Sequence, residues 1–176
     1  RVLIKNSDVV INCVGILYQT NKQKFEDIHA KFPDLLSKLC SELNIEKFVH
    51  ISALGINKTV NSQYMQSKLK GEKNILNNFN HSVILRPSLV FGPEDQFFNK
   101  FASLAEFLPV LPLIGGGQTK FQPIYVSDLC KAIVAILDKE EVNENIYELG
   151  GSQIFTFKEL MEGGELVFKM SRKPNK

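Results

Sequence analysis

The stretch Asp8–Gly15, DVVINCVG, is a short run of apolar and β-branched residues that ends at a glycine. Its apolar residues are nearly continuous instead of alternating with polar ones. That pattern is typical of a strand covered on both faces, as the strands of parallel sheets are. Because parallel strands are joined by a crossover that is usually a helix, a helix is expected after Gly15.

The segment Phe25–Leu43 has the periodicity of an amphipathic helix, since its apolar residues recur at steps of three and four. Pro33 lies inside this pattern and predicts a kink or a restart of the helix. We interpret the apolar stripe as core packing in preference to a binding face. Its members are Phe25, Ile28, Phe32, Leu35, Leu36, Leu39 and Leu43.

Two more strands follow, separated by a further helical stretch. Glu46–Ala53, EKFVHISA, predicts the second strand, and His81–Arg86, HSVILR, predicts a third strand that Pro87 ends. Strand–helix alternation of this length indicates an α/β protein with a doubly wound parallel sheet. Ligands of such sheets bind beyond the carboxyl ends of the strands. The residues at those ends are Gly15, Ser52 and Pro87.

The helical stretch Ser62–Glu72, SQYMQSKLKGE, holds Tyr64 and Lys68 four residues apart, so both side chains lie on one helix face. An ammonium group beside a phenol stabilises the phenolate. The pair is therefore expected to lower the pKa of Tyr64 and to make its hydroxyl a proton donor or acceptor near neutral pH. The alternative, which the spacing alone favours, is a half-buried core tyrosine and a solvated lysine.

From Ser88 the pattern becomes less regular. The residues up to Gly117 predict loops and one aromatic-rich helix, and Thr119–Val126, TKFQPIYV, predicts a strand. The run Gly115–Gly117 could cradle a phosphate, but a phosphate loop should open directly onto a helix N-terminus. Because these glycines precede a predicted strand, we interpret them as a flexible turn.

The last third of the chain predicts two helices and a strand. Ser127 is the expected N-cap of a helix over Asp128–Leu137, and a short strand is expected at Asn145–Leu149. Thr156 and Glu159 have the spacing of a capping box, which predicts a final helix.

The composition is that of an ordinary globular domain, with 44% apolar and 23% charged residues in a chain of 176. The net charge of +2 argues against nucleic acid or an anionic membrane as the main partner. No apolar run reaches the length of a membrane span, and no signal peptide is visible. Cys13, Cys40 and Cys130 have neither metal-ligand nor redox spacing, and their apolar contexts predict buried thiols in a reducing compartment.

Six segments, which cover most of residues 8 to 160, carry a family resemblance. They are similar to the extended short-chain dehydrogenase/reductase superfamily, which includes NAD-dependent epimerases and dehydratases. Within it, the chain most resembles the atypical branch that contains the complex I alpha-subcomplex subunit nine family. The segments are DVVINCVGIL, FVHISALGI, YMQSKLKGE, ILRPSLVFGPEDQFFNKFA, LPLIGGGQTKFQPIYVSDLCKAI and YELGG.

For the fold, the resemblance implies a Rossmann-like doubly wound parallel sheet that is incomplete. The first three strands and the glycine-rich phosphate loop are absent, because the chain begins at Arg1, in the approach to what would be the fourth strand. Residues 1–88 would form the C-terminal half of the NAD(P)-binding domain. Residues 89–162 would form part of a smaller substrate region packed on the same sheet, and residues 163–176 a divergent basic tail.

For the site, the resemblance implies that Tyr64 is the acid/base tyrosine and that Lys68 lowers its pKa and binds the nicotinamide ribose. Ser52 would polarise a substrate carbonyl. The cofactor would be NAD or NADP, with NADP slightly favoured, and no metal is expected. The implied cofactor contacts are Asn12, Val14, Gly15, Lys68, Arg86, Pro87 and Ser88.

For the function, the resemblance implies a nucleotide-binding accessory protein of respiratory NADH:ubiquinone oxidoreductase (complex I), with a structural or assembly role. Its partners would be complex I subunits. Its location would be the cytoplasm or the surface of the inner membrane, on the matrix side if mitochondrial. Whether it is an enzyme stays open. One alternative is an active nucleotide-sugar epimerase, dehydratase or reductase that uses Ser52, Tyr64 and Lys68, and another is a non-functional fragment of a split gene.

Overall fold

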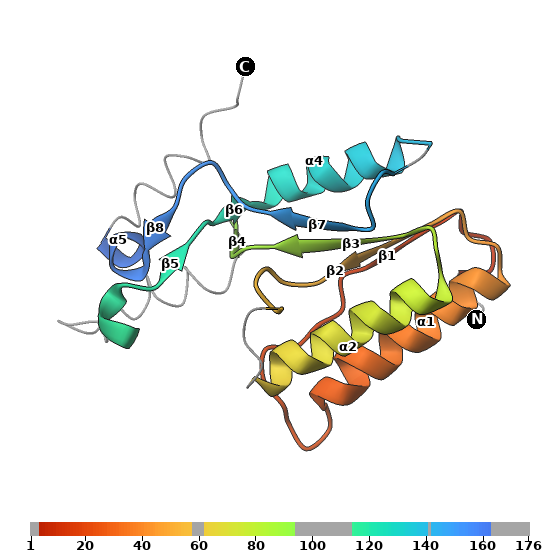
Figure 1. The fold of residues 1–176 in the computed structure, drawn as a ribbon, viewed down its shortest axis with the longest axis horizontal. Coiled ribbons are helices and arrows are strands. Elements are labelled where there is room, and N and C mark those ends of the chain that lie inside the picture. The colour runs from red at the N-terminus through yellow and green to blue at the C-terminus, as the bar shows by residue number, and fades with distance from the viewer. Residues whose placement is uncertain (1–3, 58–61, 94–113, 141, 163–176) are drawn as a thin grey trace. The chain divides into compact units, whose positions relative to one another are not determined.

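The computed structural model describes residues 4–57, 62–93, 114–140 and 142–162 (Figure 1). It divides the chain into two compact units. The first consists of Arg1–Pro87 and Ile133–Glu148, and the second of Ser88–Ala132 and Leu149–Lys176. The aromatic-rich helix expected upstream of Gly115 and the basic tail at 163–176 lie outside the described residues.

A four-stranded sheet with the order β1-β2-β3-β7 forms the centre of the first unit. The strands β1, β2 and β3 are parallel neighbours, with Asn12 opposite His50 and Ile51 opposite Leu85. A hydrogen bond of 2.7 Å from the N–H of Ile84 to the carbonyl of Asn145 joins β3 to the start of β7. The prediction of a parallel α/β sheet is confirmed. The strands are β1 Val9–Asn12, β2 Lys47–Ile51, β3 Ser82–Pro87 and β7 Ile146–Leu149.

Two long helices lie side by side on one face of this sheet, α1 (Phe32–Glu42) and α2 (Gln63–Asn78) (Figure 1). A π-helical stretch, η2 (Glu26–Lys31), leads directly into α1. Pro33 stands in the first turn of α1, where its missing N–H costs nothing, so the predicted restart of the helix is confirmed. π-Helical turns are rare and frequently occur at functional sites.

The layer between the sheet and these helices has an apolar half and a polar half. Toward the amino ends of the strands, the packed side chains are apolar: Val10, Cys40, Ile45, Phe48, Ile75 and Phe79. Toward the carboxyl ends, the buried side chains are polar or charged: Asn12, His29, His50, Ser52, Ser67, Lys68, Glu72 and Arg86. Buried polar groups are costly unless they are paired or serve a ligand, which makes the polar half the candidate site.

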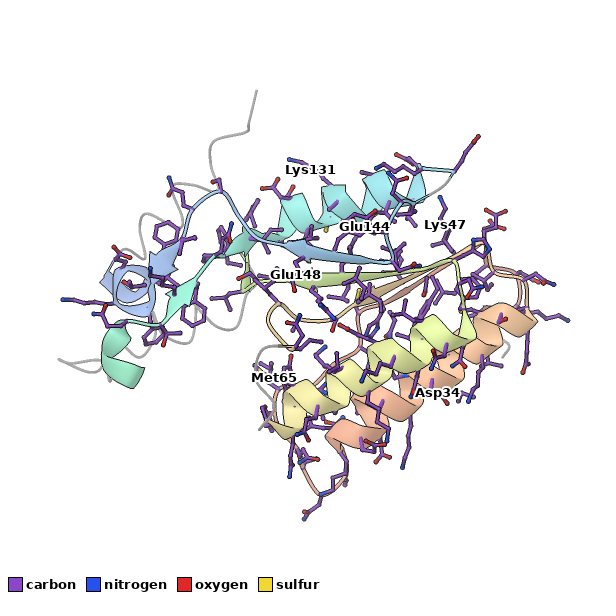
Figure 2. All side chains as sticks on the ribbon, in the orientation of Figure 1. Asp34, Lys47, Met65, Lys131, Glu144 and Glu148 are labelled. Carbon is purple, nitrogen blue, oxygen red and sulfur yellow. The ribbon has the colours of Figure 1, made fainter. Side chains whose placement is uncertain are left out.

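The opposite face of the sheet receives the end of α4 (Val126–Leu137). Lys47, labelled in Figure 2, extends from β2 and donates hydrogen bonds to the carbonyl oxygens of Leu137, at 2.6 Å, and of Lys139. A cation at a helix C-terminus satisfies carbonyls that have no partner within the helix. Lys47 therefore fixes the C-terminal end of α4 to the sheet.

In the second unit, the prediction of a single strand over Thr119–Val126 is wrong. The segment instead forms two short strands, β5 (Lys120–Phe121) and β6 (Ile124–Tyr125). Pro123 lies between them and lacks the N–H that a continuous ladder would need. β6 pairs in parallel with β4 (Val90–Phe91), and β5 pairs antiparallel with β8 (Phe155–Thr156).

The helix ends of the second unit also test two predictions. Ser127 is not an N-cap, because α4 already begins at Val126. The capping box is confirmed: the N–H of Glu159 donates to Thr156 Oγ1 at 3.2 Å, and Glu159 Oε2 accepts the N–H of Thr156 at 2.7 Å. It starts α5 (Phe157–Glu162).

Strand β1 and the turn after it carry exposed apolar side chains at the margin of the described sheet, with Ile11 43% and Val14 47% exposed. Cys40 is buried as predicted, and burial raises the pKa of its thiol to about 11. The expectation of buried thiols is wrong for Cys13 and Cys130, which are exposed. Among the described residues, no helix has both the length and the apolarity to cross a bilayer.

Candidate functional site

The carboxyl end of β1 turns through a hydrogen-bonded asparagine. Asn12 Oδ1 accepts the N–H of Val14 at 3.1 Å, which fixes the orientation of the amide. Its Nδ2 group therefore faces His50 Nδ1, at 3.0 Å, and donates to it. The proton of the neutral His50 ring then resides on Nε2. The amide of Asn12 is thus engaged within the protein, and it shapes the turn that leads to Gly15.

His29, in the π-helical stretch η2, joins three elements. Its Nε2 accepts the N–H of Ile16 at 3.1 Å, so the neutral ring carries its proton on Nδ1. Nδ1 lies 3.0 Å from Ser67 Oγ and donates to it, and the Ser67 hydroxyl donates to the Tyr64 carbonyl at 2.7 Å. The loop after β1 is thereby tied to the first turns of α2.

Both histidines are neutral at physiological pH. Burial, with a contribution from the Lys68 charge, lowers the pKa of His29 to about 4. The same causes, with a smaller effect of His29, lower the pKa of His50 to about 3. Sequence reasoning missed both residues as site components. The available signal was a histidine within a predicted apolar stripe and another within a predicted buried strand.

The expected effect on Tyr64 is wrong, because its pKa is raised, not lowered. Burial of the phenol disfavours phenolate. The ring packs edge-on against His29, at 5.2 Å between centroids, and against Phe25, at 5.6 Å. The Lys68 ammonium lies over the face of the ring, 5.7 Å from its centroid, in cation–π geometry.

Lys68 is 5% exposed, so the expectation of a solvated lysine does not hold. A Cβ placed on Gly15 would lie 3.7 Å from Lys68 Nζ and 3.8 Å from His29 Nε2. Burial lowers the pKa of Lys68, and the charge of Glu72 opposes that shift. No hydrogen-bond acceptor for Nζ is found among the described residues. The Lys68 ammonium is therefore available to donate a hydrogen bond to an oxygen of a ligand.

Ser52 lies just beyond β2 and is 6% exposed. Its backbone N–H donates to the Leu85 carbonyl at 2.7 Å, which continues the parallel ladder. Its Oγ is buried and has no partner among the described residues. A buried hydroxyl without a partner is uncommon, and a ligand oxygen would satisfy it.

The expected cofactor contacts at the carboxyl end of β3 are engaged within the protein. Arg86 binds Glu72 through Nε at 3.1 Å and Nη2 at 2.6 Å, and its Nη1 lies 3.4 Å from Glu148, which is labelled in Figure 2. The Pro87 carbonyl accepts the N–H of Leu54 at 2.9 Å. Ser88 opens the second unit, and its N–H donates to the Leu149 carbonyl at 2.8 Å.

The donors at this site fit one part of a dinucleotide. The Lys68 ammonium and the Ser52 hydroxyl suit sugar hydroxyl or carbonyl oxygens. A pyrophosphate needs a glycine turn that opens onto a helix N-terminus, and none occurs among the described residues. The glycines of Ile114–Gly117 form a short 3-10 turn ahead of β5, as predicted. In the described parts of the chain, no group of three His, Cys, Asp or Glu side chains could hold a metal ion.

Comparison with known proteins gives a family and a fold. The model of the NAD dependent epimerase/dehydratase family matches residues 2–150. A relative from Arabidopsis thaliana, NADH dehydrogenase (ubiquinone) 1 alpha subcomplex subunit 9, mitochondrial, is 35% identical over 174 residues. The match covers 98% of this chain and 42% of the relative. The Mus musculus protein of the same name is 36% identical, over 89% of this chain and 42% of its own. The chain thus spans about two fifths of these relatives.

Among solved structures, UDP-glucuronic acid 4-epimerase from Bacillus cereus, in complex with NAD, superimposes with a TM-score of 0.74. It is 23% identical, and the match covers 98% of this chain and 62% of the epimerase. A dTDP-4-dehydrorhamnose reductase from Clostridium acetobutylicum gives the same TM-score of 0.74 at 19% identity, covering 94% of this chain and 64% of the reductase. These likenesses show the fold.

Proposed function

The chain belongs to the NAD dependent epimerase/dehydratase family, and we propose that it is a nucleotide-binding accessory protein of mitochondrial complex I. In this role it contributes structure or assists assembly and does not turn over a substrate. The observation that carries the proposal is the match of almost the whole chain to relatives that are named as subunits of that complex.

The polar half of the first unit supports a retained nucleotide site. Lys68, which is 5% exposed, places its ammonium beside the Gly15 turn, and Ser52 presents a buried hydroxyl. In the bound state, Lys68 would donate to a ribose hydroxyl and Ser52 to a carbonyl oxygen. The nucleotide would be NAD or NADP, and NADP is our choice on the family resemblance alone. Asn12 and His29 would shape the turn against which the nucleotide lies.

The state of Tyr64 supports a role without turnover. Where a nicotinamide cofactor is bound, it supplies the hydride chemistry, and the protein must move a proton at the substrate oxygen. Efficient proton transfer needs a group whose pKa is near the operating pH. Burial moves the pKa of Tyr64 in the opposite direction, and the Lys68 ammonium lies over the ring. The phenol therefore holds its proton at neutral pH.

A second candidate is an active epimerase, dehydratase or reductase. The unpartnered hydroxyl of Ser52 favours it, because that atom is where a substrate oxygen would bind. A bound dinucleotide would then have to lower the pKa of Tyr64.

A rescue experiment in the organism that encodes the chain separates the two candidates. Deletion of the gene is expected to lower the amount of assembled complex I, as measured on native gels. A copy carrying Tyr64→Phe should restore assembly, because the phenyl ring keeps the contacts with His29 and Phe25. An unchanged amount of complex I in the deletion strain would overturn the accessory role. Failure of Tyr64→Phe, together with rescue by the wild type, would favour the enzyme.

A further inference from the structure

The loop between β1 and η2 exposes two large hydrophobic side chains that are neighbours in the sequence. Leu17 is 83% exposed and Tyr18 73%, the highest values among the large hydrophobic side chains of the described residues. The loop projects past the start of α2 (Figure 1). Hydrophobic side chains that are exposed singly are common on protein surfaces, but an adjacent pair on a projecting loop indicates a contact with a partner.

Hydrogen bonds on both sides of this apolar pair fix the loop. Before the pair, the N–H of Ile16 donates to His29 Nε2 at 3.1 Å. After it, Gln19 Oε1 accepts the N–H of Phe25 at 3.0 Å, and Gln19 Nε2 donates to Gln63 Oε1 at 3.2 Å. The loop is thus tied to η2 and to α2, and this frame holds the apolar pair in the solvent.

The second half of the loop carries two lysines. It turns at Thr20, whose Oγ1 accepts the N–H of Lys22 at 3.2 Å and the N–H of Gln23 at 3.1 Å. Lys22 and Lys24 are both exposed, and neither pairs with a carboxylate of the described residues. The loop is therefore a region of positive charge beside the apolar pair.

No carboxylate offsets this charge within the loop, because residues 9–25 contain no Asp or Glu. The first two carboxylates beyond it are already paired. Glu26 binds Lys70 at 2.5 Å, and Asp27 binds Lys31 at 2.8 Å. The net charge of +2 describes the whole chain and hides this local excess.

Apolar side chains flanked by lysines match the chemistry of an anionic lipid surface. A leucine enters the boundary of the acyl chains, and a tyrosine is favoured at the interface because its ring is apolar and its hydroxyl stays hydrated. The ammonium groups of lysines are attracted to anionic headgroups. A projecting loop also inserts into a bilayer without a preformed pocket, which a protein partner would have to provide.

We propose that the loop at residues 16–24 docks on an anionic membrane surface. Leu17 and Tyr18 insert at the boundary between headgroups and acyl chains, and Lys22 and Lys24 lie at the headgroups. Two apolar side chains and two lysines make a weak, reversible contact. That agrees with the balanced net charge, which argues against a membrane as the main partner. The contact requires neither a nucleotide nor complex I, so it goes beyond the function proposed above.

The test uses a fluorescent reporter in the loop. The sequence contains no tryptophan, so Leu17→Trp introduces a single one. The full chain is titrated with vesicles of phosphatidylcholine and phosphatidylserine in equal amounts, and with vesicles of phosphatidylcholine alone. On the anionic vesicles the emission should shift to the blue and should be quenched by lipids with brominated acyl chains. The matched control is Leu35→Trp on α1, where the leucine is 58% exposed, and its emission should not respond.

A second comparison tests the charge. Lys22→Gln combined with Lys24→Gln should weaken the binding of the Leu17→Trp chain to anionic vesicles by about 25-fold, from about fivefold for each lysine near a charged surface. The control combines Lys5→Gln with Lys73→Gln, which removes two exposed lysines outside the loop. It should weaken binding by less than about threefold, because salt screens distant charges.

Three results would overturn the proposal. The first is the absence of a response of Leu17→Trp to anionic vesicles, which would leave a protein as the partner of the loop. The second is an equal response of the Leu17→Trp and Leu35→Trp chains. The third is equal weakening by the two pairs of lysine substitutions. Since no nucleotide and no complex I are present, each of these results leaves the accessory role untouched.

Discussion

His29 Nε2 accepts a hydrogen bond of 3.1 Å from the backbone N–H of Ile16, so one imidazole holds the loop that follows β1. The other ring nitrogen reaches Ser67 in α2. Protonation of Nε2 would break the bond to Ile16, because both nitrogens of an imidazolium are donors. The candidate site is therefore assembled around a histidine that must stay neutral.

This arrangement predicts a loss of stability in mild acid. The pKa of His29 is 6.5 in its ordinary state and about 4 in the folded chain. The unfolded chain takes up this proton as the pH falls below 6.5, and the folded chain does not. The contribution is therefore present above pH 6.5 and is lost between pH 6.5 and 4, by on the order of 3 kcal/mol. Urea unfolding of the wild type and His29→Gln at pH 7 and pH 4.5 checks this. An equal pH dependence in both would count against the assignment.

A second prediction concerns a close approach between α2 and η2 at Gly71. A Cβ on Gly71 would overlap the carbonyl oxygen of His29. Gly71→Ala should therefore destabilise the chain by about 2–3 kcal/mol, despite the better helix propensity of alanine. Gly15→Ala is the control, because its Cβ would meet Lys68 and His29 only at ordinary contact distance. It should change the free energy of unfolding by less than about 0.5 kcal/mol, as measured by denaturant titration.

A third prediction concerns the opposite face of the sheet. Lys47→Met removes the donor that satisfies the last carbonyls of α4 and should destabilise the chain by about 1–2 kcal/mol. Lys131→Met, which removes an exposed lysine that pairs with Asp128, should cost less than about 0.5 kcal/mol. Thermal unfolding of the two variants side by side decides the matter. Equal melting temperatures would show that the contact with α4 adds nothing.

Much of the fold could be predicted because its signals are local. The apolar run at Asp8–Gly15 and the stripe around Pro33 predicted β1, η2 and α1, since periodicity reports which side chains face the core. The prediction of one strand over Thr119–Val126 was wrong because it gave more weight to the β propensity of the segment than to Pro123, which interrupts the strand. Ser127 was misplaced by the ordinary uncertainty of helix ends.

The site was less predictable, because its contacts join residues that lie far apart in the sequence. Spacing placed Tyr64 and Lys68 on one helix face, but it could not indicate how deeply that face is buried. Burial reverses the expected shift in the pKa of Tyr64. The bonds from Asn12 to His50 and from His29 to Ser67 each span 38 positions, and no local pattern predicts them.

A fourth prediction concerns the nucleotide. The 176-residue chain by itself should bind NADH or NADPH no more tightly than about 1 mM. The described residues offer Lys68 and Ser52 but no pyrophosphate site, and two such contacts cannot offset the entropy lost on association. Calorimetric titration with both dinucleotides tests this. Fusing a strand, glycine loop and helix to the chain should strengthen binding, and Lys68→Ala should then weaken it. One-to-one binding in the micromolar range to the chain alone would mean that residues such as Gly115–Gly117 hold the phosphates.

The most direct test of the accessory role is where the protein migrates. An epitope-tagged copy is expressed from its own promoter, and mitochondria are solubilised in mild detergent and resolved on a native gel. The tag should migrate with the NADH dehydrogenase activity band, and Lys68→Ala should leave that position unchanged if the role is structural. Migration of the wild-type protein only at the size of a free monomer, or its absence from mitochondria, would contradict the proposal.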